Sequence, residues 1–222
     1  MPAPAEAQPR QARSPDPLTP GPRAKKLRIA GLVLAAGGSR RMGRPKQLLP
    51  YGDGVLLDVV LSTARACRFA QLVLALGGSS EEVLKSVNTS GCDVAVNPDF
   101  STGCASSIAA ALPALHPETD VVVLLLGDQP GVMAGSVQRL LAGRRTAEIA
   151  VCRYDNGIGH PFAFARSALP ALAGLRGDKA VWKLLEERAA EVTEVAVPGP
   201  IPLDINTDAD YERVLDALRG AQ

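Results

Sequence analysis

Short apolar runs alternate with longer amphipathic segments along the chain from Leu27 onwards. Hydrophobicity in most of these runs is continuous rather than alternating, which is typical of strands that are covered on both faces. Six runs predict strands, over Ile29–Ala36, Leu72–Gly77, Val94–Val96, Val121–Leu126, Ile149–Cys152 and Val192–Val197. Six amphipathic segments predict helices, over Leu56–Cys67, Ser80–Val87, Ala105–Leu115, Gly135–Ala142, Lys179–Ala190 and Ala209–Leu218.

This alternation predicts an α/β fold with a mostly parallel sheet and helices on both faces. In such sheets ligands bind beyond the carboxyl ends of the strands. Unusual residues do follow the apolar runs, so we expect the functional site at that edge. The segment Gly157–Phe164 interrupts the alternation, and we expect it to belong to a smaller subregion that closes over the site.

Residues 1–27 differ in composition from the rest of the chain. Seven prolines fall within the first 22 residues, among Ala, Arg, Gln and Ser. Proline removes backbone donors and the segment has little apolar side chain to bury, so we predict a disordered tail. No internal repeat and no second core are visible, and we therefore place a single domain over residues 28–222.

The charge and cysteine content argue against several classes of function. The 24 basic and 23 acidic side chains give a net charge of +1, whereas proteins that coat nucleic acid or an anionic membrane carry a marked basic excess. No apolar run is long enough to span a bilayer, and we find no apolar secretory signal. The four cysteines form no Cys-x-x-Cys pair, which favours reduced thiols in a cytoplasmic protein.

A glycine-rich loop with three basic side chains follows the first predicted strand. Gly37 and Gly38 allow a tight turn in which backbone N–H groups approach an anion. Arg40, Arg41 and Lys46 lie within nine residues of these glycines, so their charges can face one ligand. The combination suits a polyphosphate, and a purely structural turn is the alternative. Neither the Walker loop nor the dinucleotide fingerprint G-x-G-x-x-G matches.

The sequence LAAGGSRRMGRPKQLLP, Leu34–Pro50, resembles the signature of the molybdenum cofactor cytidylyltransferase-like branch of the nucleotidyltransferases. The resemblance spans nearly the whole chain after residue 28. It implies a Rossmann-like sheet, Mg²⁺ as cofactor, and a triphosphate held by Arg41 and Lys46. The guanylyltransferase branch usually has LAGG here, so Ala36 favours CTP over GTP. The nucleotide-binding residues it implies are Leu34, Ala35, Ala36, Gly37, Gly38, Ser39, Gly78, Asn97, Gly103 and Ser107.

Asp128 follows the apolar run Val121–Leu126 within the sequence Gly-Asp-Gln-Pro. A carboxylate at this edge of a sheet suits Mg²⁺, which usually meets a protein through one or two carboxylates plus phosphate oxygens. Capping of the next helix is the alternative role for Asp128. Because Asp-Gln-Pro after an apolar strand also resembles the family's metal-binding motif, we favour the metal role.

Two further candidates for the metal region, Asp204 and Asn206, precede the last predicted helix. The sequence Asp-Ile-Asn-Thr resembles the family's D-I-[DN]-T motif, which implies that both contribute to the metal site. Asn206 in place of Asp weakens direct ligation but keeps an oxygen acceptor. Thr207 is a good N-cap, and Asp208 and Asp210 suit a first helical turn, so we assign these three residues to capping.

The start of the helix predicted at Ala105 is a third candidate region. Free N–H groups at a helix start attract anions, and the resemblance places Asn97, Gly103 and Ser107 against the nucleotide. Cys104 stands where methionine is more usual in the family. We do not assign it as a nucleophile, because no partner base is identifiable in the sequence.

The sequences Gly159-His160-Pro161 and Gly177-Asp178-Lys179 resemble the family's acceptor-side motifs. The resemblance implies that His160, Pro161, Gly177 and Asp178 shape the pocket of the second substrate. A structural role is the alternative for a lone histidine. Lys179 departs from the small residue that is usual after this aspartate, which leaves the identity of the acceptor open.

Together these residues favour attack of an acceptor phosphate on the α-phosphorus of a nucleoside triphosphate, with Lys46, Arg41 and Asp128 as catalytic groups. The acceptor that the resemblance implies is a molybdopterin-type cofactor. The alternatives are transfer to a sugar or other small-molecule phosphate, and a non-catalytic protein that binds the molybdenum cofactor and delivers it. A transient contact with a molybdoenzyme or its chaperone is part of this hypothesis, and a dinucleotide oxidoreductase is disfavoured.

Overall fold

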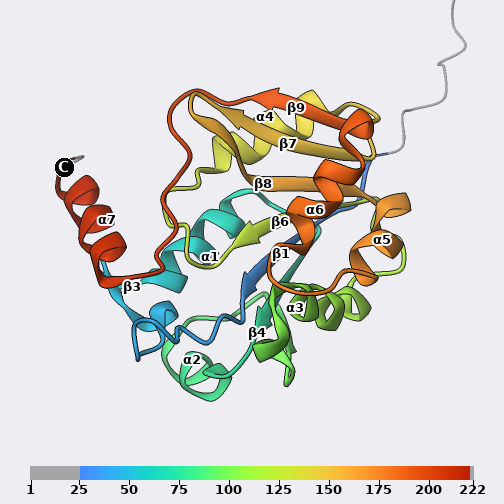
Figure 1. The fold of residues 1–222 in the computed structure, drawn as a ribbon. Helices are drawn as coiled ribbons and strands as arrows, with labels where there is room; N and C mark the ends of the chain where they lie inside the picture. Colours follow the sequence, from blue (N-terminus) through green and yellow to red (C-terminus); the bar gives the residue numbers. More distant parts are fainter. Residues whose placement is uncertain (1–25, 221–222) are drawn as a thin grey trace, which may run out of the picture.

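A seven-stranded sheet forms the centre of the molecule in the computed structural model, which describes residues 26–220. The strand order is β5-β4-β1-β6-β8-β7-β9, and every strand except β8 runs in the same direction (Figure 1). The strands are β1 (Ile29–Ala35), β4 (Gln71–Leu76), β5 (Asp93–Val96), β6 (Val121–Leu126), β7 (Ile149–Tyr154), β8 (Gly157–Ala165) and β9 (Val192–Ala196). The mostly parallel sheet predicted from the sequence is thus confirmed.

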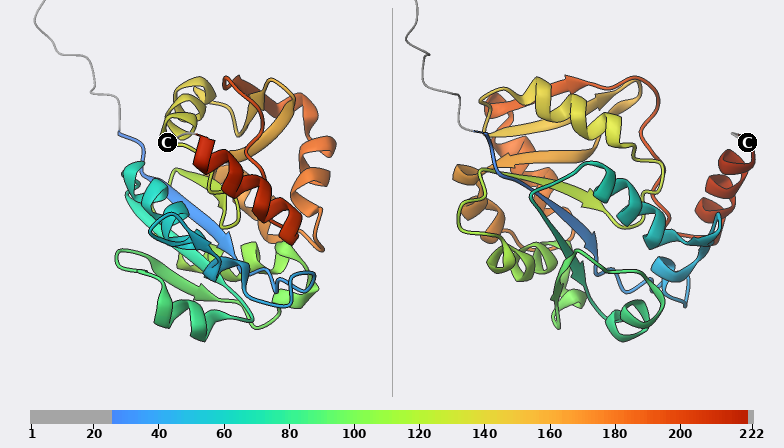
Figure 2. Two further views of the ribbon diagram at one scale, coloured as in Figure 1. Left: turned by 90° about the vertical axis from the view of Figure 1, so that its left-hand side faces the viewer. Right: turned by 180° about the vertical axis from the view of Figure 1, so that it is seen from behind.

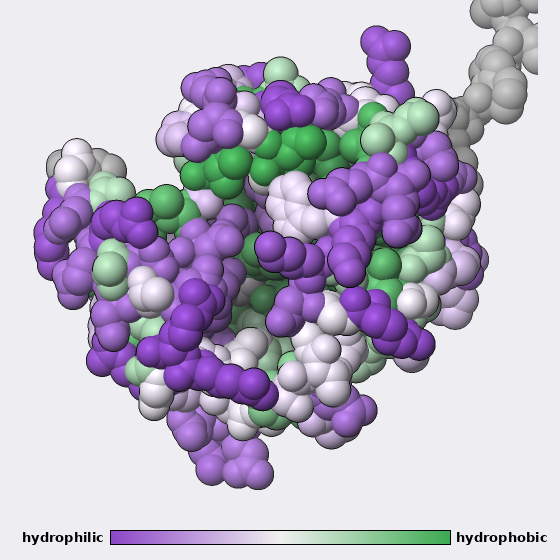
Figure 3. Space-filling model, in the orientation of Figure 1, coloured by the Kyte–Doolittle hydropathy of each residue, from purple (hydrophilic) through white to green (hydrophobic). Residues whose placement is uncertain are grey.

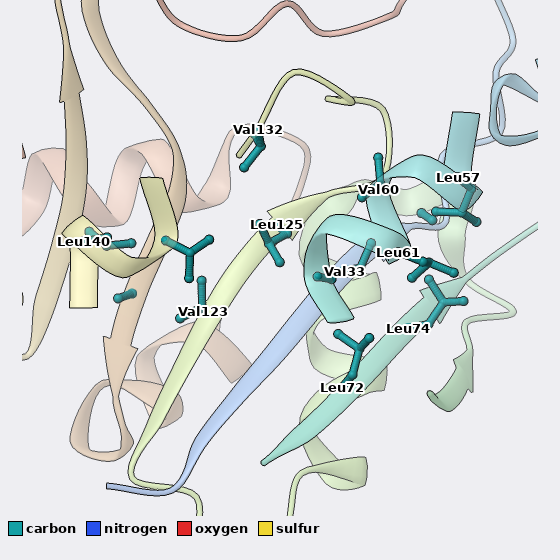
Figure 4. Packing of buried hydrophobic residues seen from close by; sticks show 14 of the residues in the cluster. Val33, Leu57, Val60, Leu61, Leu72, Leu74, Val123, Leu125, Val132 and Leu140 are labelled. Atoms are coloured by element: carbon teal, nitrogen blue, oxygen red, sulfur yellow. The ribbon is translucent and has the colours of Figure 1, made fainter. Parts of the chain in front are cut away.

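Helices cover both faces of this sheet, as predicted (Figure 2). One apolar cluster joins the sheet to α1, α2 and α4, and Figure 4 shows part of its packing. A second cluster joins the opposite face to α3, α5 and α6. The helices are α1 (Leu56–Ala66), α2 (Ser80–Ser86), α3 (Cys104–Ala111), α4 (Ala134–Arg144), α5 (Leu169–Ala173), α6 (Ala180–Glu187) and α7 (Asp208–Gly220). No helix within residues 26–220 is long and apolar enough to cross a membrane.

The expectation for Gly157–Phe164 was wrong, because these residues form most of the central strand β8. The strand pairs antiparallel with β6 on one side and with β7 on the other. Its buried side chains alternate between the two faces of the sheet: Phe162 and Phe164 belong to the cluster with α3, α5 and α6, and Ala163 belongs to the opposite cluster. Pro161 lacks a backbone N–H and lies where the β7–β8 register shifts, which is a position that tolerates proline in a strand.

The last helix, α7, packs beside the loop that follows β1. Its Tyr211 and Val214 join a third apolar cluster with Leu49, and the Tyr211 hydroxyl donates to the Pro50 carbonyl. A short hairpin of β2 (Pro50–Tyr51) and β3 (Gly54–Val55) leads from that loop into α1. The chain segment just before α7 is thereby held next to the glycine-rich loop.

The predicted capping of α7 is present. The Thr207 hydroxyl accepts from the Asp210 backbone N–H at 3.2 Å and donates to the Asp210 carboxylate at 2.8 Å. That carboxylate also accepts from the Asn206 backbone N–H at 3.1 Å. These reciprocal bonds satisfy donors at the helix start and fix the segment that carries Asn206. Asp208 instead pairs with Arg44 of the glycine-rich loop at 2.7 Å.

Candidate active site

A cavity of about 530 Å³ lies at the carboxyl ends of β1 and β6. Figure 3 shows a hollow on this face of the molecule, bordered mainly by hydrophilic residues. Thirteen of the predicted site residues line the cavity, namely Leu34, Ala35, Ala36, Gly37, Gly38, Ser39, Arg41, Lys46, Ser107, Asp128, His160, Asp178 and Asn206. The others (Gly78, Asn97, Gly103, Pro161, Gly177 and Asp204) are not among its lining residues.

The loop after β1 is fixed by two of its own polar side chains. The buried amide of Gln47 donates to the Ala35 carbonyl at 2.6 Å and to the Gly37 carbonyl at 3.1 Å. The Ser39 hydroxyl accepts from the Lys46 backbone N–H at 3.0 Å. The glycine-rich loop therefore has a defined shape on the cavity wall, which carries Arg40, Arg41 and Lys46.

Lys46 joins three segments that are far apart in the sequence. Its ammonium group forms an ion pair with the Asp128 carboxylate and donates to the Ile205 carbonyl at 3.0 Å. The Asn206 amide oxygen lies 3.4 Å away. The side chains of Lys46 and Asp128 are only 14% and 17% exposed, so water screens this pair weakly. The fold thus brings the glycine-rich loop, the end of β6 and the segment before α7 together.

Asp204 lies behind the cavity wall rather than on it. Its carboxylate accepts from the Gln129 amide, and the Ile205 backbone N–H donates to the Asp128 carbonyl at 3.1 Å. Burial raises the pKa of Asp204, and the nearby negative charge of Asp128 raises it further. Asp204 and Gln129 therefore hold the 204–206 segment against Asp128.

The donors beside Lys46 have the chemistry that Mg²⁺ requires. Asp128 contributes carboxylate oxygens and Asn206 an amide oxygen on the cavity wall. Within the described residues, no three His, Cys, Asp or Glu side chains gather into a metal-binding group. This donor set fits Mg²⁺, since that ion usually binds one or two carboxylates and completes its shell with water and phosphate oxygens.

The start of α3 is clasped by the loop that precedes α6. The Cys104 backbone N–H donates to the Asp178 carboxylate at 3.1 Å, and the Ala105 backbone N–H donates to the Gly177 carbonyl at 3.2 Å. Gly103 has a φ of 116°, and a Cβ there would lie 2.6 Å from the Gly177 carbonyl carbon. Burial, followed by the charge of Asp178, raises the pKa of the Cys104 thiol to about 11, so the thiol is protonated near pH 7.

Asn97 supports the cavity wall through α3. Its buried amide donates to the hydroxyls of Ser106 at 2.8 Å and Ser107 at 3.0 Å. Gly78 acts in a similar indirect way, because the ring of Phe100 occupies the space where its Cβ would lie. Phe100 and Ser107 reach the cavity, whereas Asn97 and Gly78 stand behind them.

His160 belongs to an aromatic group on the other side of the cavity. Its ring stacks on Phe162 with centroids 4.0 Å apart, and Trp182 of α6 meets both rings edge-on. Burial lowers the pKa of His160 to about 3, so its ring is neutral near pH 7. Pro161 follows with a cis peptide bond.

Residues 31–192 match the family model of the MobA-like NTP transferase domain. The chain belongs to this family. The resemblance inferred from the Leu34–Pro50 signature is therefore confirmed, and the site lies in a nucleotidyltransferase fold.

Two curated relatives of this MobA-like NTP transferase are named for different activities, one as an oxidoreductase and the other as a cytidylyltransferase. The nicotine blue oxidoreductase of Paenarthrobacter nicotinovorans is 31% identical over 169 residues, covering 72% of this chain and 82% of that protein. The molybdenum cofactor cytidylyltransferase of Escherichia coli (strain K12) is 30% identical over 141 residues, covering 62% and 70%. The solved structure of Rv0371c from Mycobacterium tuberculosis H37Rv in complex with manganese is 44% identical with a TM-score of 0.78, covering 86% and 99%.

Sequence reasoning missed several residues of the site in this MobA-like NTP transferase. Gln47 directly follows the signature lysine, yet only the fold reveals that its amide binds two loop carbonyls. Trp182 is the single tryptophan of the chain, which was an available signal for its part in the cavity wall. Phe100 carried no signal, because it lies in a single 3-10 turn, Phe100–Thr102, between β5 and α3.

Proposed function

We propose that this protein transfers a nucleoside monophosphate, CMP in preference to GMP, from a nucleoside triphosphate to a phosphorylated acceptor, with release of pyrophosphate. The acceptor that we favour is a molybdopterin-type cofactor, and the reaction takes place in the cytoplasm. The observation that carries the proposal is the contact of Lys46 with Asp128 and Asn206 inside the cavity. Membership of the MobA-like NTP transferase family supports it.

The proposed reaction exchanges one P–O bond for another. A phosphate oxygen of the acceptor forms a bond to the α-phosphorus, the bond to the bridging oxygen of the β-phosphate breaks, and pyrophosphate leaves with that oxygen. Lys46 and Arg41 neutralise charge on the leaving group, and the N–H groups of Gly37 and Gly38 bind phosphate oxygens. An anionic acceptor needs no strong general base.

Mg²⁺ is the proposed cofactor, with Asp128 and Asn206 as the residues that would hold it and Asp204 as the residue that supports them. When bound, the ion would supply neutralisation of phosphate charge. The structure of Rv0371c, which is 44% identical to this chain, was solved in complex with manganese, and this supports the proposal that a divalent metal binds here. Lys46 forms an ion pair with the Asp128 carboxylate, which places a positive charge beside this proposed metal site.

The preference for CTP rests on two observations. Ala36 stands where the guanylyltransferase branch usually has glycine, and the Escherichia coli relative is named a cytidylyltransferase. The proposed contacts with the nucleotide come from Leu34–Ser39 and Ser107 on the cavity wall, with Gly78, Asn97 and Gly103 behind it. We further propose that the product passes to a molybdoenzyme or its chaperone through a transient contact.

A matrix of nucleoside triphosphates against phosphorylated acceptors, scored by pyrophosphate release with Mg²⁺, tests this function. We expect CTP with a molybdopterin-type acceptor to give the highest rate. Asp128→Ala should lower that rate by about 10²–10³-fold, whereas Asp53→Ala on the exposed β2–β3 turn should leave it unchanged. Full activity of Asp128→Ala would overturn the assignment, and tight acceptor binding without pyrophosphate release would favour a carrier.

A second candidate function is an oxidoreductase reaction. It is favoured by one observation, the 31% identity to nicotine blue oxidoreductase. A reductase needs a hydride donor, so the same preparation should be tested for oxidation of NADH or NADPH in the presence of nicotine blue. Oxidation without pyrophosphate release in any transferase assay would select this function instead.

A further inference from the structure

The cavity wall formed by β8 and α6 differs in chemistry from the wall formed by the loop after β1. His160 of β8 and Val181 and Trp182 of α6 line it, together with Leu124 and Leu126 of β6. The loop after β1 contributes three basic side chains instead. One side of the cavity therefore suits phosphate groups, and the other side suits an uncharged, flat and partly apolar group.

The two walls are separated by the width of about two strands. In the sheet order β6 lies between β1 and β8, and neighbouring strands lie about 4.8 Å apart, so the separation is roughly 10 Å. Phe162 pairs with Leu124 in antiparallel register, so His160, two residues earlier, lies near the carboxyl end of β6. A ligand with a phosphate near Lys46 and a ring near His160 spans this separation.

Trp182 is held in a defined orientation while it stays accessible. It lies in α6, which runs beside β8 in Figure 1, and its ring meets Phe162 at 5.3 Å and 88°. Phe162 is fully buried, whereas Trp182 is 38% exposed. A large aromatic side chain that is fixed by its neighbours and exposed at a cavity offers area for stacking at a small cost in conformational entropy.

His160 adds a hydrogen-bonding group to the same wall. Its side chain is buried, with 8% of the residue exposed, and it lines the cavity. Within residues 26–220 no side-chain hydrogen bond reaches its ring nitrogens, and its backbone carbonyl accepts from the Tyr154 hydroxyl at 2.8 Å. A neutral imidazole offers one donor and one acceptor, which matches the edge of a nitrogen heterocycle.

We propose that Trp182 and His160 form a subsite for a planar, uncharged heteroaromatic ring of the acceptor. The ring stacks on Trp182, and its edge forms a hydrogen bond with His160. This proposal rests on the proposed function, which assigns the loop after β1 to the nucleotide and thereby leaves the wall of β8 and α6 to the acceptor. With this subsite, the protein recognises two groups on the acceptor, its phosphate and its heterocyclic ring.

Binding of pterin, a planar heterocycle without phosphate, tests this subsite directly. Trp182 is the only tryptophan, so its fluorescence reports the subsite alone. We expect pterin to quench it saturably, both in the wild type and in Lys46→Met. By calorimetry, Trp182→Leu should weaken pterin binding about 5- to 150-fold, Trp182→Phe should retain most of it, and Leu84→Ala on the exposed face of α2 should not change it.

Each outcome separates the subsite from the proposed function. Equal binding of pterin by Trp182→Leu and the wild type would overturn the subsite, even if pyrophosphate release is normal. Quenching by CTP but not by pterin would assign Trp182 to the nucleobase and would overturn it too. Pterin binding that depends on Trp182, in a protein that releases no pyrophosphate with any substrate pair, would leave the subsite in place and remove the transferase function.

Discussion

The ion pair between Lys46 and Asp128 is the residue-scale feature on which the site depends. Both side chains are mostly buried, and each neutralises the charge of the other. A triphosphate offers a competing partner for Lys46, and a divalent cation offers one for Asp128. In the free protein the pair therefore stabilises the junction of three segments, and in the proposed reaction its two members act on different ligands.

Replacing Lys46 by Met should impair both activity and stability. Loss of the ammonium group removes charge neutralisation at the leaving phosphates, and we expect kcat/KM for pyrophosphate release to fall about 10²–10³-fold. The same change leaves the mostly buried Asp128 carboxylate without its partner, which should lower the free energy of unfolding by about 1–3 kcal/mol, between the values for exposed and fully buried pairs. Urea unfolding and steady-state kinetics measure the two effects.

The double variant Lys46→Met with Asp128→Asn is the control for this interpretation. Neutralising both partners removes the uncompensated charge, so we expect its stability loss to be smaller than the sum of the single losses. Additive losses together with wild-type turnover would show that the pair is neither coupled nor involved in catalysis.

His160 should make the stability of the protein sensitive to acid. Burial lowers its pKa from 6.5 to about 3, so between these values the unfolded chain binds a proton at His160 and the native protein does not. Stability from this residue is present above pH 6.5 and falls as the pH is lowered, by up to about 1.4 kcal/mol per pH unit. In urea unfolding from pH 7 to pH 4, His160→Phe should show a smaller loss than the wild type; equal losses would contradict the prediction.

At the scale of elements, the clasp between α3 and the loop before α6 joins the two sides of the cavity. Gly103 lies in the positive-φ region and against the backbone of Gly177 and Asp178. A side chain at position 103 is strained in its own conformation and displaces the opposite loop. The clasp therefore requires glycine for two independent reasons.

Two glycine-to-alanine variants should consequently change stability in opposite directions. Gly103→Ala should lower the free energy of unfolding by about 1–3 kcal/mol because of backbone strain and contact with the loop. Gly135→Ala in α4 should raise it by up to about 1 kcal/mol, since nothing lies near the added methyl group and alanine favours a helix. Urea unfolding of both variants measures these changes. Wild-type stability of Gly103→Ala would contradict the prediction and would show that the loop at Gly177 and Asp178 moves aside without cost.

Sequence pattern predicted the parallel strands well and failed at β8 for a physical reason. Buried parallel strands consist of continuous apolar runs, and β1, β4 and β6 have this form. The first five residues of β8 include two glycines and a proline, a composition typical of loops. The register shift beside Pro161 accommodates it, and such a shift depends on pairing with β7, which local sequence does not encode.

At the scale of the whole molecule, site residues that directly follow strands in the sequence were easier to predict than site residues that reach the cavity only through tertiary packing. Asp128 and the glycine-rich loop follow β6 and β1 directly, so the parallel topology alone places them at one edge. The orientation of Trp182 follows from how α6 packs on β8, and the support by Gln129 follows from the path of the segment before α7. These contacts join distant parts of the chain, and no local pattern predicts them.

The whole-molecule arrangement also predicts that residues 1–25 are dispensable for folding and for the proposed activity. Residues 26–220 by themselves contain the seven-stranded sheet, three apolar clusters and the cavity. The fold is tied down at Arg28, whose backbone N–H donates to the Asp120 carboxylate at 2.8 Å and whose carbonyl accepts from the Asp120 N–H at 2.8 Å. We place the domain boundary just before this residue.

Deleting residues 1–25 should therefore leave the free energy of unfolding within about 0.5 kcal/mol of the full chain, the usual range for changes away from packed features. Pyrophosphate release and pterin binding should also be unchanged. A matched deletion that ends after Arg28 removes the bonds to Asp120 and should lower stability. A loss of activity without loss of stability in the shorter deletion would contradict the boundary and assign the proline-rich segment a role at the site.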